Sequence, residues 1–95
     1  MNTFEFLTHW YQTQCDGEWE HEYGVKIETI DNPGWLVRID LVFTKLEDIE
    51  TEGESVENGP GDWYLYSIKN NVFTASGDPG KLERILDIFR TFASK

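Results

Sequence analysis

The chain has 95 residues, of which 39% are hydrophobic and 15% aromatic, enough for one domain with a packed core and too many for a disordered chain. Its single cysteine excludes an intrachain disulfide, and no apolar run approaches the roughly 20 residues of a membrane helix. The 18 acidic and 8 basic residues give a net charge of −10, which disfavours direct nucleic-acid binding. Because the N-terminus also lacks the basic start of a signal peptide, we expect a soluble cytoplasmic protein.

A first helix is expected from Thr3, acting as N-cap, to Gln14 or Cys15. Asp16-Gly17 should end it, because glycine readily adopts the left-handed conformation that follows many helices. The face expected to be buried carries apolar residues at helical spacing: Phe4, Leu7, Trp10, Tyr11 and Cys15.

Residues 19–27 alternate between aromatic or aliphatic and charged side chains, which predicts a strand with one wet face. Asn32-Pro33-Gly34 predicts a type II turn, with proline at the first central position and glycine at the second. The matching strand of this hairpin has apolar residues at alternate positions, namely Trp35, Val37, Ile39, Leu41 and Phe43.

Residues 47–61 show no periodicity and are rich in acids and glycine, so we expect an acidic mobile loop there. Residues 62–69 and 72–77 predict two further strands, joined by Asn70-Asn71, which tolerate the positive φ of a tight hairpin. Asp78-Pro79 predicts the start of a C-terminal helix with Asp78 as its cap. The apolar stripe of that helix consists of Leu82, Ile85, Leu86, Phe89 and Phe92.

Together these elements predict one α+β domain over residues 1–95, built as a four-stranded antiparallel meander sheet with the N-terminal and C-terminal helices packed on one face. The other face should be open to water. It would hold Glu18, Glu20, Glu22, Lys26, Glu28, Arg38 and Asp40.

Ten of the acids fall in two short segments without any lysine or arginine, which leaves eight acids and eight bases in the rest of the chain. Such segments are either solvated loops that maintain solubility or a docking surface for a cationic partner. Trp19, flanked by two glutamates, is the expected aromatic anchor of such a surface. The candidate partner-binding acids are Asp16, Glu18, Glu20 and Glu22 in the first segment, and Glu47, Asp48, Glu50, Glu52, Glu54 and Glu57 in the second.

No catalytic set, metal site or cofactor site is evident. Cys15 falls at a helix C-terminus beside acids, which disfavours a thiolate, so we expect a buried and inert thiol. On a regular strand His21 would point away from the neighbouring glutamates, so these residues would not enclose a metal ion; it is expected in the core or at its rim, and His9 on the surface. Residues 77–81 contain a Gly-Lys pair but lack the rest of a phosphate loop.

Several motifs of the chain resemble those of a known protein family. They are the run Gln14-Cys15-Asp16-Gly17-Glu18-Trp19-Glu20-His21, then Tyr23-Gly24-Val25-Lys26-Ile27, Thr29-Ile30-Asp31-Asn32-Pro33-Gly34-Trp35, Ile39-Asp40-Leu41, Asp62-Trp63 and Gly77-Asp78-Pro79. With them the chain resembles the immunity protein 53 family of bacterial polymorphic toxin systems. The resemblance implies a cytoplasmic antidote that binds a toxin domain encoded beside it. It assigns no role to the acidic segment 47–57.

The residues and the resemblance together favour a non-catalytic immunity protein that binds a basic toxin domain, such as a nuclease, through its acidic surface. One alternative is an acidic module for another cationic partner. A less favoured one is a small sulfurtransferase-like enzyme, since similar sequences have been labelled rhodanese-related sulfurtransferases. Neither nucleic acid nor a membrane is an expected direct partner.

Overall fold

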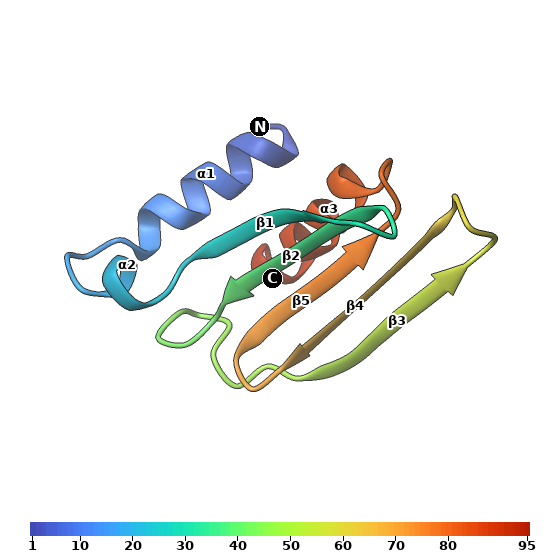
Figure 1. Cartoon of the computed structure of the whole chain (residues 1–95). Helices are drawn as coiled ribbons and strands as arrows, with labels where there is room; N and C mark the ends of the chain where they lie inside the picture. Colours follow the sequence, from blue (N-terminus) through green and yellow to red (C-terminus); the bar gives the residue numbers. More distant parts are fainter.

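The computed structural model describes all residues from 1 to 95 (Figure 1). Its elements, in chain order, are α1 (Thr3–Gln14), α2 (Trp19–Glu22), β1 (Val25–Ile30), β2 (Gly34–Asp40), β3 (Thr51–Glu57), β4 (Trp63–Lys69), β5 (Val72–Gly77) and α3 (Leu82–Ala93). None of the three helices has the length and hydropathy needed to cross a membrane.

The five strands form one antiparallel sheet in the order β1-β2-β5-β4-β3. The α+β class and the antiparallel sheet are therefore confirmed, but the prediction of a four-stranded meander is wrong. After β2 the chain crosses to the far edge as β3 and returns through β4, so that β5 lies beside β2. β5 belongs at the centre because Phe73 and Ala75 are fully buried, which requires a strand on each side and a helix above.

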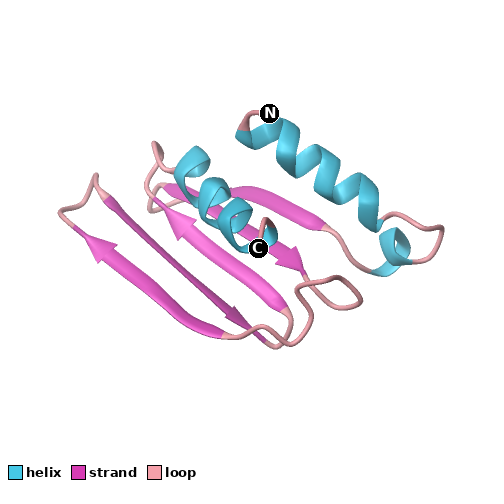
Figure 2. Ribbon diagram, turned by 180° about the vertical axis from the view of Figure 1, so that it is seen from behind, coloured by secondary structure: helices cyan, strands magenta, loops and turns pink.

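Helices α1 and α3 lie on the same side of the sheet (Figure 2). The ring of Phe89 in α3 packs edge-on against Phe73 of β5, with centroids 5.4 Å apart, and against Trp10 of α1 at 5.0 Å. Ile85 and Leu86 complete the buried stripe of α3. The hydrophobic core thus lies between α3 and the inner strands β2, β5 and β4, and α1 contributes Trp10 to it.

The predicted helix α1 is confirmed, but its N-cap is Asn2 rather than Thr3. The Asn2 side chain accepts from the backbone N–H of Glu5, and the Glu5 carboxylate accepts from the backbone of Asn2, which is a capping box. Thr3 is buried instead, and its hydroxyl donates to Asp87 of α3. The contact with α3 thus occupies the Thr3 hydroxyl that was expected to cap the helix.

The β1–β2 hairpin is present, but its connection is not the type II turn predicted from the sequence. The Asn32-Pro33 peptide bond is cis, and Gly34 starts β2 opposite Ile30 without a positive φ. A Cβ at Gly34 would lie 2.3 Å from the carbonyl oxygen of Gly77. Glycine is needed here for the close approach of β2 to β5, not for a left-handed turn.

The β4–β5 hairpin is confirmed, with φ values of 54° at Asn70 and 61° at Asn71. The prediction of a loop throughout residues 47–61 is wrong, because Thr51–Glu57 pairs with β4 as the edge strand β3. A register shift between Thr51 and Glu54, with Gly53 at φ +73°, interrupts the pairing. The bulge and the acids on both faces remove the alternation by which a strand is usually recognised.

Candidate functional site

The first acidic segment does not form a strand. Asp16 Oδ1 accepts hydrogen bonds from the backbone N–H groups of Glu18 and Trp19, both at 2.9 Å, and thereby starts the single turn α2. The Glu20 carboxylate reaches back to the N–H groups of Asp16 and Gly17 at 3.0 and 2.9 Å. The strand predicted from the period-two pattern of residues 19–22 is therefore wrong, because these local hydrogen bonds stabilise a helical turn instead.

Two of the four acids in this segment are therefore occupied by backbone groups. Hydrogen bonds from the N–H groups of Trp19 and Glu18 lower the pKa of Asp16, and those from Glu20 itself and from Asp16 and Gly17 lower the pKa of Glu20. Glu18 and Glu22 are exposed and make no ion pair or side-chain hydrogen bond. Their charges are thus available to a partner.

Trp19 does not lie at the rim where the sequence placed it. Its side chain is only 5% exposed, and its Nε1 donates to the carbonyl oxygen of Val42 at 2.9 Å. The indole packs between Trp10 and Tyr23, with centroids 6.2 and 6.1 Å away. Trp19 therefore fixes α2 to the core.

Phe43, which the sequence assigned to the apolar face of a strand, is an exposed aromatic residue beside this segment. β2 ends at Asp40, and Phe43 lies in the following loop at φ 62°, with its side chain 74% exposed. Its N–H donates to Glu47 Oε2 at 2.9 Å, and its ring lies 6.1 Å from that of Tyr23. A bulky residue held at positive φ and open to solvent is typical of a binding surface, and no sequence signal distinguishes it from a core phenylalanine.

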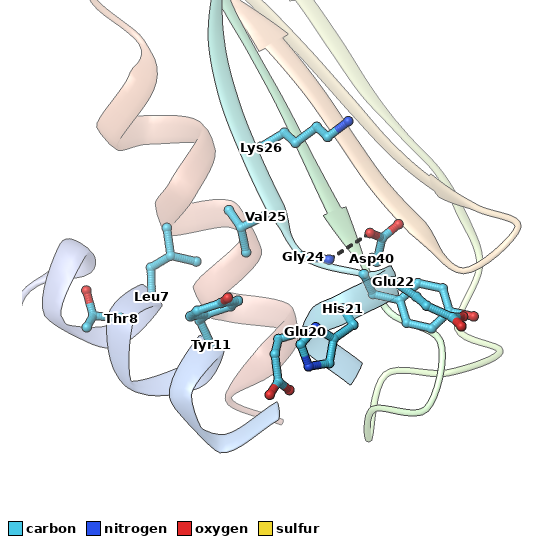
Figure 3. A pocket seen from close by; sticks show the side chains of 11 residues that line it. Leu7, Thr8, Tyr11, Glu20, His21, Glu22, Gly24, Val25, Lys26 and Asp40 are labelled. Atoms are coloured by element: carbon cyan, nitrogen blue, oxygen red, sulfur yellow. Dashed lines mark hydrogen bonds between the residues drawn. The ribbon is translucent and has the colours of Figure 1, made fainter. Parts of the chain in front are cut away.

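We call the surface around α2 the α2 rim and define it as Asp16, Glu18, Glu20, Glu22, Tyr23 and Phe43. A hollow of about 440 Å³ lies at the rim and is lined by Gln14, Asp16, Glu18, Trp19, Glu22, Tyr23 and Phe43. A larger open groove of about 640 Å³ adjoins it and runs between α1 and β1 (Figure 3). His21, expected in the core or at its rim, is exposed and lines this groove, while His9 is exposed on α1 as predicted.

The second acidic segment lies elsewhere. Glu47 lies near the α2 rim through its bond to Phe43, and Asp48 and Glu50 lie between it and β3. Glu52, Glu54 and Glu57 lie on β3, at the opposite edge of the sheet from β1 (Figure 1). Glu52 pairs with Lys69 at 3.4 Å, and Glu54 accepts from the Tyr66 hydroxyl at 3.3 Å. Asp48, Glu50 and Glu57 are exposed without an ion pair. The two segments are thus separate surfaces that meet only at Glu47.

The thiol, metal-site and Gly-Lys candidates from the sequence show no arrangement typical of a catalytic or metal site. Cys15 is exposed rather than buried as predicted, and its Sγ donates to the Tyr11 carbonyl oxygen at 3.3 Å at the C-terminus of α1. Carbonyl groups rather than N–H groups converge there, which is the wrong polarity for a reactive thiolate. No cluster of His, Cys, Asp and Glu has the geometry of a metal site. Lys81, from the Gly-Lys pair, binds Asp78 and Asp62 at 2.6 and 2.8 Å.

The family model of immunity protein 53 matches residues 4–94, from the first turn of α1 through the end of α3. The chain belongs to the immunity protein 53 family. Searches of curated proteins and of solved structures gave no significant match. The matched span of this immunity protein 53 member includes the α2 rim, the groove beside α1 and all of β3.

Proposed function

We propose that this immunity protein is a non-catalytic inhibitor that binds a basic toxin domain, such as a nuclease, through the α2 rim in the cytoplasm of the producing cell. Family membership supports the antidote role. The chemistry is supported by the net charge of −10 and by the absence of any lysine or arginine between residues 16 and 22. Carboxylates that pair with the lysines and arginines of a nuclease compete directly with its phosphate substrate.

One observation carries the choice of surface: the unpaired carboxylates of Glu18 and Glu22 line the same hollow as the exposed ring of Phe43. An aromatic anchor surrounded by charges is the usual composition of an energetic centre in a protein interface. Asp16 and Glu20 hold the loop in place, so they present the other two acids on a rigid support.

The second acidic segment has a different part in the proposal. Because Thr51–Glu57 is a strand, its acids do not lie in the mobile loop that the sequence predicted. Glu47, Asp48, Glu50, Glu52, Glu54 and Glu57 instead add to the negative field that draws a cationic partner toward the molecule. Their contribution is to the association rate, which falls as salt rises.

The test compares three double charge reversals, each of which changes the net charge from −10 to −6. Glu18→Lys with Glu22→Lys removes the unpaired acids of the α2 rim. Glu50→Lys with Glu57→Lys reverses the second segment, and Asp31→Lys with Glu83→Lys is the matched control on exposed residues outside both segments. Binding to the catalytically inactive toxin domain encoded beside this gene is measured by calorimetry and by stopped flow.

The rim variant should lose affinity by at least about 10-fold through faster dissociation, because it places like charges in the interface. The reversal in the second segment should slow association and leave dissociation unchanged. The control should resemble wild type apart from a small loss of rate. Equal losses of affinity in all three variants would mean that the α2 rim contributes only through its charge and not as a specific contact. That result would favour an acidic module that binds cationic partners in general.

A further inference from the structure

Strand β1 is an edge of the sheet whose backbone groups are available for pairing. The N–H of Asp40 donates to the carbonyl of Gly24 at 3.1 Å, and hydrogen-bonded and non-bonded pairs alternate along an antiparallel ladder. The N–H and C=O groups of Val25, Ile27 and Thr29 therefore point away from β2. On the far side of β2, the bond from Leu41 N–H to Asn71 fits the same alternation.

Helix α1 presents apolar side chains toward this free edge. Thr3 and Trp10 face α3 and are buried, whereas Phe4, Leu7 and Tyr11 lie on the neighbouring face at helical spacing. Phe4 and Tyr11 are 49% and 37% exposed. Figure 3 shows Leu7 and Tyr11 pointing across the groove toward Val25. A helix in a two-layer fold normally buries such a stripe on a strand, and here no strand of the chain lies beneath it.

A groove lies between the helix and the start of the free strand edge. The groove has a volume of about 640 Å³, and its lining includes Leu7, Tyr11 and Val25. Ile27 lies on the helix side of β1, opposite Val37, and is 39% exposed, whereas Val37 is fully buried. An unpaired strand edge and a partly exposed apolar floor therefore lie at one place.

The end of the groove nearest α2 is negatively charged. Glu20, Glu22 and Asp40 line it, against Lys26 as the one lysine or arginine in the lining. None of these residues makes an ion pair, and Asp40 only accepts from the N–H of Gly24 at 2.9 Å. An occupant of this groove would thus be stabilised by a lysine or arginine at that end.

We propose that an extended segment of the toxin domain adds to the free edge of β1 as a sixth strand beneath α1. Its alternate apolar side chains pack on Leu7, Tyr11 and Ile27, and a lysine or arginine at one end lies by Glu22 and Asp40. The inference rests on the proposed function, since it names how the same partner is held. A second copy of this chain is the poorer occupant, because each copy carries a charge of −10.

The test is Ile27→Pro, which removes an outward-pointing N–H and places a ring where a new strand would pair. Proline is tolerated on an edge strand where the lost N–H faces solvent, so β1 should keep its bonds to β2. Ser55→Pro on β3 is the matched control, because Asn58 donates to Asp62 and the same alternation turns the N–H of Ser55 outward on the other edge. Thermal unfolding of both free variants establishes that they fold.

With the inactive toxin domain as probe, Ile27→Pro should weaken binding by at least about 10-fold, and Ser55→Pro should bind as wild type does. In the wild-type complex, hydrogen exchange should slow at Val25, Ile27 and Thr29 and stay unchanged on β3. The sixth strand would be overturned, and the antidote role left intact, by two results together: Ile27→Pro binds with wild-type affinity, and exchange on β1 does not slow in the wild-type complex. If the wild-type protein does not bind the toxin domain, both the sixth strand and the antidote role are overturned. If the wild-type protein is a dimer and Ile27→Pro is a monomer, the occupant of the groove is a second copy of this chain.

Discussion

Asp78 is the side chain that joins the end of β5 to β4 and to the start of α3. Its Oδ2 accepts from the N–H of Trp63 at 2.9 Å and from Lys81 Nζ at 2.6 Å, and its Oδ1 accepts from the N–H of Gly80 at 2.8 Å. The residue is 3% exposed. The sequence predicted Asp78 as the cap of the C-terminal helix, but the N-cap is Lys81, and the carboxylate instead organises the turn before α3.

Asp78 should therefore make stability depend on pH. The Lys81 side chain and the N–H of Trp63 lower the pKa of Asp78 from 3.8 to about 2. Since the folded-state pKa lies below the unfolded value, this stabilisation is complete above about pH 4 and is lost as pH falls toward 2. Urea unfolding of wild type and Asp78→Asn at several pH values should show a less stable variant at pH 7 and a difference that shrinks below pH 4. A difference independent of pH would contradict the role of the charge.

At the scale of elements, β3 shows how an acidic segment can still be a strand. It is an edge strand whose glutamates face solvent, and charges on an edge oppose unwanted pairing with another sheet. Its partner β4 holds it through the backbone, and Gly53 allows the bulge at which the register of the pair shifts. A Cβ at Gly53 would lie 1.7 Å from the carbonyl oxygen of Tyr66.

Gly53→Ala should consequently destabilise the protein by at least about 1 kcal/mol, because it adds both a backbone clash and a strained positive φ. Gly61→Ala is the matched control, since a Cβ there meets nothing within 4 Å. Chemical denaturation measures both variants, and hydrogen exchange locates the effect. In Gly53→Ala, hydrogen exchange should become faster in β3 and β4 before it does so elsewhere. Equal stability of the two variants would mean that β3 is not paired with β4 as described.

For the whole molecule, the uneven distribution of charge matters more than its total. The second acidic segment begins near the α2 rim at Glu47, and within it Glu52 pairs with Lys69. A net charge of −10 on 95 residues also repels itself, which opposes the compact state. The same charge that serves recognition thus lowers the stability of the free protein.

Salt should move stability and binding in opposite directions. Raising NaCl from roughly 20 to roughly 500 mM screens the self-repulsion, so the unfolding temperature of the free protein should rise. The affinity for the toxin domain should fall over the same range, with the loss mainly in the association rate. Thermal scans and stopped flow in the same buffers check both signs. An affinity that does not change with salt would contradict electrostatic recognition.

The sequence was most informative where one interaction dominates. Regular periodicity identified α1 and α3, and Asn70-Asn71 identified the β4–β5 hairpin, since only residues that tolerate positive φ suit such a tight turn. The acids of the candidate site were also visible as a local excess of charge. Which of them are free was not, because Asp16 and Glu20 are occupied by backbone groups that become neighbours only when α2 folds.

The sequence by itself determined the α+β class, the helices at both ends and the strong negative charge, which follow from local pattern and composition, while its motifs resemble those of the family that the chain belongs to. Only the tertiary structure decided the strand order, the burial of Trp19, the exposure of Phe43 and the free edge of β1 beside α1. The physical reason is competition for buried space. The local sequence placed Trp19 on the surface and Phe43 on an apolar strand face, and the structure has the reverse, because which ring enters the core depends on how α2 and β2 end against Trp10 and Tyr23.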